Sequence, residues 1–136
     1  MKTVFVDTSG FAGLLVGRDA SHERAVALFE QARNEHWQLL TTNGVVMECY
    51  SLLLIRARDG RRGALAFLDA LARDRVLVER VRAEDEARAI ALLRAHEDKT
   101  YSLCDATSFV VMQRLGISDA IAFDRHFREY GAFTIL

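Results

Sequence analysis

The chain opens with the apolar run Thr3-Val4-Phe5-Val6, which ends at Asp7. β-branched and aromatic residues favour extended backbone, so four of them in a row predict a short buried strand. A second apolar segment follows almost at once, and Phe11 to Val16 is expected to form a helix. A buried strand that leads directly into a helix is the repeating unit of α/β proteins, and it sets the expected fold class.

The rest of the chain continues this alternation. Ser21 is a suitable N-cap for the helix after it, Asp59-Gly60 ends the third helix, and Gly116 ends the last one. We expect strands at Gln38–Thr41, Val76–Val81, Ala120–Phe123 and Phe133–Leu136, and helices at His22–Asn34, Asn43–Arg58, Arg62–Arg73, Glu84–Ala95 and Asp105–Leu115. The sequence therefore predicts an α/β fold, a three-layer sandwich around a mostly parallel sheet of four to five strands.

Length and composition favour one globular domain over residues 1–136. Hydrophobic residues make up 51% of the chain, and no proline, repeat or low-complexity tract marks a linker. No apolar run approaches the roughly 18 to 20 residues of a membrane span, so no membrane association is expected. Cys49 and Cys104 lie in apolar segments and are expected to be buried thiols in a reducing compartment, which favours a cytoplasmic protein.

Charge and loop motifs exclude several function classes. The formal net charge of -1 excludes a strongly basic surface, so a nucleic-acid partner has to be bound by a local patch or through metal ions. Glycine-rich loops of the GxGxxG or GxxxxGK type are absent, which excludes dinucleotide binding and P-loop chemistry.

Four carboxylates stand where they could meet. Asp7 and Asp124 each follow a predicted strand, Asp105 begins a predicted helix, and Glu48 lies inside the apolar segment Val45–Ile55. Each has a structural explanation when taken alone: the aspartates can cap helices or turns, and Glu48 can lie on an exposed edge or pair with an arginine. Because functional groups of parallel sheets gather at the carboxyl ends of the strands, one shared site explains all four together.

Such a cluster needs compensating positive charge. Carboxylates held together repel one another, so cations or protons have to neutralise them. Ligation by oxygen alone selects hard cations, which makes Mg²⁺ or Mn²⁺ the expected cofactor. Two such ions roughly 4 Å apart can activate water and stabilise the leaving oxygen of a phosphodiester, so hydrolysis of a polyanion is the reaction that fits.

The chain resembles the PIN-domain family, and within it the VapC-type toxins of bacterial toxin-antitoxin pairs. The similarity extends over essentially the whole chain. It rests on four segments: Val6-Asp7-Thr8-Ser9-Gly10-Phe11, Thr41-Thr42-Asn43 with Glu48, Ser102-Leu103-Cys104-Asp105-Ala106, and Phe123-Asp124-Arg125-His126-Phe127. The resemblance implies a PIN-like, Rossmann-like fold and a metal-dependent endoribonuclease that leaves a 3′-hydroxyl and a 5′-phosphate. It assigns Asp7, Glu48, Asp105 and Asp124 as catalytic metal ligands.

The resemblance also implies partners besides the RNA substrate. These are a small antitoxin protein, whose tail inserts near the acidic pocket, and a second copy of the chain in a homodimer. The apolar segments Val45–Ile55 and Ala64–Leu71 are candidate surfaces for either, although packing in the core explains them equally well. The sequence leaves the identity of the RNA open.

Several polar residues near these segments have two interpretations. Asp98 could be an additional acid of the site, but a solvated loop residue is favoured, and Thr42 and Asn43 could lie near the metals or cap a helix. His126 is interpreted as part of the scaffold or as adjacent to substrate. The basic residues of one segment could contact RNA phosphates or form a solvated helix end: Arg56, Arg58, Arg61 and Arg62.

Two other functions are alternatives to this one. A phosphatase of the HAD type also places an aspartate after the first strand, but it needs a second aspartate two positions on, and this chain has Ser9 there. A PIN scaffold that only binds RNA or protein is the non-enzymatic alternative. The presence of all four acids argues against it.

Overall fold

The computed structural model describes all residues from 1 to 136 and contains one sheet of five strands. Every neighbouring pair of strands is parallel, and the spatial order is β3-β2-β1-β4-β5. The strands are β1 (Thr3–Val6), β2 (Gln38–Thr42), β3 (Leu77–Glu79), β4 (Asp119–Ile121) and β5 (Thr134–Ile135). The expected mostly parallel sheet is therefore confirmed, with β1 at its centre.

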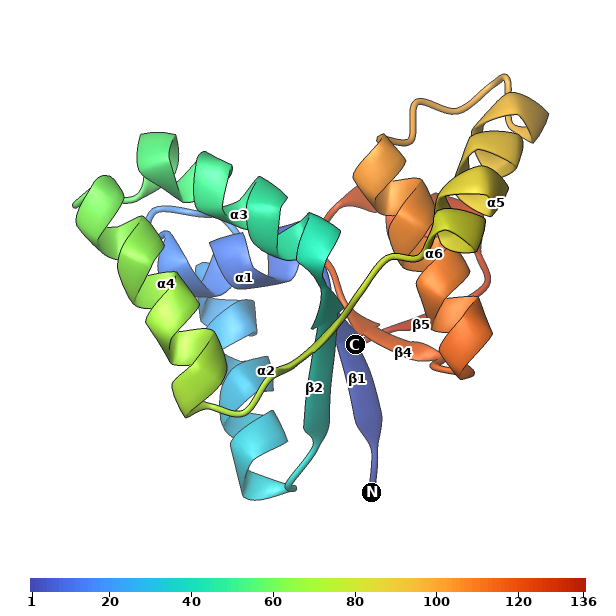
Figure 1. The fold of residues 1–136 in the computed structure, drawn as a ribbon. Coiled ribbons are helices and arrows are strands. Elements are labelled where there is room, and N and C mark those ends of the chain that lie inside the picture. Colours follow the sequence, from blue (N-terminus) through green and yellow to red (C-terminus); the bar gives the residue numbers. More distant parts are fainter.

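Seven helices connect and cover the strands. They are α1 (Thr8–Leu15), α2 (His22–Asn34), α3 (Asn43–Arg56), α4 (Arg61–Arg73), α5 (Ala83–Ala95), α6 (Leu103–Leu115) and α7 (Arg125–Tyr130). Figure 1 shows α1 to α4 on one side of the sheet and α5 and α6 on the other, so the three-layer arrangement is also confirmed. No helix has the length and apolar character needed to cross a membrane.

The predicted elements differ from the observed ones mainly at their ends. Helix α1 begins at Thr8 instead of Phe11, because Asp7 caps it directly after β1. Helix α3 ends at Arg56, and β3 is shorter than the predicted Val76–Val81. Helix α7 was not predicted, because its six residues are too few to show a helical period; in the structure Asp124 caps it.

An aromatic cluster fixes α6 and α7 against the sheet. Phe127 of α7 stacks on Phe5 of β1, with ring centroids 6.2 Å apart, and meets Phe109 of α6 edge to face at 4.8 Å. All three side chains are fully buried. Offset and edge-to-face aromatic pairs add stability beyond the burial of their surface. The cluster thus holds the start of α7, and Asp124 with it, beside the end of β1.

The strand order creates a switch point between β1 and β4. From β1 the chain first moves outward through β2 to β3, and then crosses back to add β4 and β5 on the other side. Ligand sites of parallel sheets form outside the carboxyl ends of the strands at such a point. Helix α1 lies very close to the end of β4, since a Cβ on Gly10 would be 2.6 Å from the Ile121 carbonyl oxygen. Glycine is therefore required at position 10.

Candidate metal centre

A pocket of about 410 Å³ opens at the carboxyl ends of β1 and β4, and all four predicted acids line it. They reach it from different places: Asp7 follows β1, Asp124 caps α7, Asp105 lies in the first turn of α6, and Glu48 projects from α3. The other lining residues are Thr8, Ser9, Ala12, Asp19, Ser21, Leu52, Arg56, Ser102, Phe123 and His126. The structure therefore brings together residues that are up to 117 positions apart in the sequence.

Asp7 is the most deeply buried of the four acids, with 3% of its surface exposed. Burial, followed by the negative charge of Asp105, raises its pKa from 3.8 to about 7. The only side chain that hydrogen-bonds to it is neutral: the hydroxyl of Ser9 donates to Oδ2 at 2.9 Å. A buried carboxylate without a cationic partner is unfavourable as an anion, so this position would be stabilised by a bound cation.

Ser9 connects two parts of the site. Its hydroxyl oxygen accepts hydrogen bonds from the backbone amides of Phe123 at 2.9 Å and Asp124 at 3.2 Å, while its hydroxyl proton goes to Asp7. This one side chain therefore ties the start of α1 to the end of β4. No role in the site was predicted for Ser9, although it lies two positions after Asp7 in the segment Val6-Asp7-Thr8-Ser9-Gly10-Phe11.

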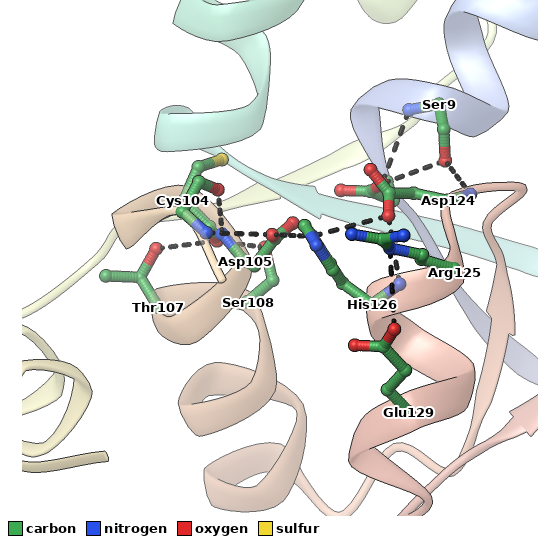
Figure 2. A network of polar contacts seen from close by, with 11 residues as sticks. Ser9, Cys104, Asp105, Thr107, Ser108, Asp124, Arg125, His126 and Glu129 are labelled. Atoms are coloured by element: carbon green, nitrogen blue, oxygen red, sulfur yellow. Dashed lines mark hydrogen bonds and ion pairs between the residues drawn. The ribbon is translucent and has the colours of Figure 1, made fainter. Parts of the chain in front are cut away.

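Asp105 and Asp124 meet at His126, as Figure 2 shows. The imidazole Nδ1 lies 2.7 Å from Oδ2 of Asp105 and 3.3 Å from Oδ1 of Asp124. Because an ionised carboxylate can only accept hydrogen bonds, Nδ1 is the ring nitrogen that carries a proton and donates to Asp105. Both acids also cap helices: Asp105 Oδ2 accepts from the Ser102 amide at 3.0 Å, and Asp124 Oδ1 accepts from the His126 amide at 2.9 Å.

Glu48 is exposed, so its place in an apolar helix does not bury its charge. It lies on the side of α3 that faces the pocket, while Cys49 next to it is buried in the core. Burial raises the pKa of the Cys49 thiol to about 12, and the charges of Asp7 and Glu48 contribute. Burial and the same carboxylates raise the pKa of Cys104 as well. Both cysteines are free thiols beside a strongly negative site, where they remain protonated.

The donor set fits a hard cation, although its ligands are not yet arranged around one. No three His, Cys, Asp or Glu side chains form a group that could hold a metal ion as the structure stands. The hydrogen bonds that hold the three aspartates fall on one oxygen of each: Oδ2 of Asp7, Oδ2 of Asp105 and Oδ1 of Asp124. Their second oxygens remain to coordinate an ion, and carboxylate oxygens are the ligands Mg²⁺ and Mn²⁺ prefer.

Most of the other candidate residues lie outside the pocket. Asp98 is an exposed loop residue 3.8 Å from Lys99, in agreement with the favoured interpretation. Thr42 caps α3 by accepting from the Val45 amide, and Asn43 accepts from the Val81 amide. Of the four arginines of the basic segment only Arg56 lines the pocket; the others are exposed. A second cavity of about 660 Å³, largely apolar, lies between α1, α2 and α4, away from the acids.

Comparison with known proteins agrees with this architecture. The PIN-domain family model matches residues 4–132. The chain is 38% identical over 128 residues to the 23S rRNA-specific endonuclease VapC20 of Mycobacterium tuberculosis, a match that covers 94% of each protein. The crystal structure of VapC20, described as a sarcin-ricin loop cleaving toxin, superimposes with a TM-score of 0.87 over 98% of both chains at 37% identity.

Two more distant structures share the fold alone. A toxin-antitoxin complex from Klebsiella pneumoniae gives a TM-score of 0.69 at 16% identity, covering 96% of this chain and 95% of that one. VapBC2 from Rickettsia felis gives a TM-score of 0.69 at 11% identity, covering 98% of this chain and 97% of that one. With the family model spanning nearly the whole sequence, this chain belongs to the PIN-domain family.

Proposed function

We propose that this protein is a Mg²⁺- or Mn²⁺-dependent endoribonuclease whose metal ligands are Asp7, Glu48, Asp105 and Asp124. One observation carries the proposal: three aspartates line one pocket, and the hydrogen bonds on each leave its second carboxylate oxygen available. The most buried of them, Asp7, has no cationic partner, and its pKa is raised to about 7. A divalent ion supplies the compensating charge, and family membership supports the nuclease reaction.

The residues of the chain divide the work of positioning the reactants. When bound, the metal ions would activate water and stabilise the leaving oxygen of the phosphodiester. Ser9 holds Asp7 and the backbone before α7 in one fixed relation, and His126 does the same for Asp105 and Asp124. Ligands held by such surrounding hydrogen bonds keep their orientation, which favours a well-defined coordination geometry.

The substrate and partners are proposed from the relatives. Because the mycobacterial relative is a 23S rRNA-specific endonuclease described as cleaving the sarcin-ricin loop, we propose that loop as the RNA to test first. A role as the toxin of a toxin-antitoxin pair, with a small antitoxin and a homodimer, follows from the same similarity. Light scattering of the purified chain at micromolar concentrations tests the homodimer, and a monomer throughout that range would contradict it.

The decisive experiment measures cleavage of a sarcin-ricin loop hairpin with Mg²⁺, with Mn²⁺ and with a chelator. Asp124→Asn removes one proposed ligand while keeping the shape of the side chain and its ability to cap α7. We expect cleavage to fall by at least roughly 100-fold, because water activation and charge stabilisation are both lost.

Asp98→Asn is the matched control, since it removes the same charge from an exposed loop outside the pocket. It should cleave at the wild-type rate. An Asp124→Asn protein with wild-type, metal-dependent activity would show that this aspartate is only a helix cap. A wild-type protein that cleaves no RNA with either metal would refute the proposed nuclease function.

A further inference from the structure

One side of α3 carries two opposite charges into the same pocket. Glu48, Leu52 and Arg56 are spaced four residues apart, and all three line the pocket. Residues at this spacing lie on the same face of a helix, so Glu48 and Arg56 are separated by about 12 Å along the helix axis. Arg56 is the only lysine or arginine among the lining residues. It therefore provides the only permanent positive charge of an otherwise acidic cavity.

The guanidinium of Arg56 is held by a single contact. Its Nη2 lies 3.1 Å from Oδ2 of Asp19, and the Arg56 side chain makes no other hydrogen bond. Asp19 belongs to the loop between α1 and α2, where its other oxygen accepts from the Ser21 amide at 2.9 Å. The Arg56 side chain is 40% exposed, so most of its five N–H donors remain available to a ligand in the pocket.

We propose that Arg56 binds a phosphate of the RNA backbone next to the scissile one, and that Asp19 holds the guanidinium in place until that phosphate replaces it. The inference rests on the proposed function, because it concerns how the same pocket binds RNA. A backbone phosphate is the partner that matches the planar fork of an arginine, which can donate two parallel hydrogen bonds to it. Partly exposed ion pairs are weak, so exchange of the Asp19 carboxylate for a phosphate costs little free energy.

The charge balance of the pocket favours this assignment. The cavity is lined by Asp19 as well as by the four proposed metal ligands, and this negative charge repels a polyanion. Metal ions bound by the four acids would compensate the charge around the scissile phosphate. The neighbouring phosphate would still face Asp19, and Arg56 is the residue beside it that can attract RNA.

The two members of this ion pair should affect RNA binding in opposite directions. Arg56→Ala is expected to raise KM about tenfold with kcat changed less than about twofold, since the phosphate contact forms in both the ground and transition states. Asp19→Asn releases the guanidinium and removes a repulsive charge, so it should tighten binding about two- to threefold. Arg56→Lys keeps the charge but not the fork, and its KM should fall between those of the wild type and Arg56→Ala.

Binding is measured by fluorescence anisotropy of the labelled hairpin RNA in Ca²⁺, with a gel to verify that the RNA stays intact. Loss of one phosphate contact should reduce the slope of log Kd against log salt by about 0.7. Arg73→Ala is the matched control, because Arg73 also pairs with an aspartate but lies outside the pocket, at the far end of α4. It should leave KM and the salt dependence unchanged.

The results separate this inference from the proposed function. In one outcome, the Arg56→Ala and Asp19→Asn proteins both lose thermal stability but keep the wild-type KM and salt dependence. The ion pair would then serve only to hold the α1–α2 loop. That result would overturn the role of Arg56 while leaving the nuclease intact. A wild-type protein that neither binds nor cleaves the RNA would overturn both.

Discussion

Two buried aspartates of this protein are in opposite electrostatic states. Asp7 and Asp85 are 3% and 1% exposed, and each lies at the start of a helix. Arg114 donates to both oxygens of Asp85 at 2.9 Å, and these hydrogen bonds lower the pKa of that carboxyl. Asp7 receives only neutral donors, and burial raises its pKa to about 7.

The difference shows which buried charge serves the fold and which is left for a ligand. Arg114 reaches Asp85 in α5, Glu79 in β3 and the Arg80 carbonyl, so it fastens α6 to the edge of the sheet. Nothing equivalent reaches Asp7, although the need for compensation is the same. A buried acid that the protein itself neutralises is structural, whereas one left without a cation indicates a binding site.

Replacement of Asp85 should have the largest effect on folding. Asp85→Asn leaves the largely buried Arg114 without its main partner, and breaking such a pair is expected to cost about 3 kcal/mol in the free energy of unfolding. Urea denaturation measures this loss. Asp69→Asn, which removes the same charge from the exposed face of α4, should change stability by less than about 0.5 kcal/mol. Equal stability of the two variants would contradict the structural role of Asp85.

Replacement of Asp7 should stabilise the metal-free protein, in contrast to replacement of Asp85, and the size of this effect should depend on pH. In the metal-free protein Asp7 binds a proton more tightly when folded, because its pKa there is about 7 against an ordinary value of 3.8. Its contribution to stability is therefore present below about pH 4 and is lost as the pH rises towards 7, by up to about 1.4 kcal/mol per pH unit. Asp7→Asn should remove this dependence and equal or exceed the wild type in stability at pH 7.5.

Added Mn²⁺ should reverse the order of stability of the wild type and Asp7→Asn. If the proposed ligands hold Mn²⁺ in their ionised form, its stabilisation of the wild type should grow between pH 5.5 and 7.5 and nearly vanish in Asp7→Asn. Asp85 adds no slope in this range, because its pKa is lowered and its contribution disappears only in more acidic solution. Melting temperatures with and without Mn²⁺ measure both effects. The same Mn²⁺ shift in both proteins would exclude Asp7 as a ligand.

Replacement of Ser9 should have the smallest effect on the free energy of unfolding. This neutral hydroxyl is the side-chain partner of Asp7, whereas Asp85 has the charged guanidinium of Arg114. Ser9→Ala removes the donor to Asp7 and leaves the amides of Phe123 and Asp124 without their acceptor, which should cost about 1 to 2 kcal/mol. Ser108→Ala is the control: it removes a buried hydroxyl that donates to the Cys104 carbonyl within α6. Equal unfolding free energies for the two variants would show that Ser9 is no special link.

Much of this architecture could be predicted from local patterns. The periods of apolar residues located five strands and six of the seven helices, and Gly116 ends α6 in the left-handed conformation expected of a glycine C-cap. Helix α7 was missed because six residues contain too few periods to recognise. The four acids were predicted because two strand ends, a helix start and an apolar helix can meet at one edge of a parallel sheet, and because the resemblance to the PIN-domain family assigns the same positions. Ser9, Asp19 and the contacts of His126 were not, because their roles depend on partners distant in sequence.

The sequence by itself determined the α/β class and the parallel sheet, because these depend on residue periodicity and on the order of elements along the chain, and it nominated the four acids as one candidate site. It could not show that Asp7 and Asp85, which both lie at helix starts, have different charge partners. Only the tertiary structure placed Arg114 beside one and no cation beside the other. The charge state of a buried carboxyl depends on its neighbours in space, which the folded chain brings together from separate segments.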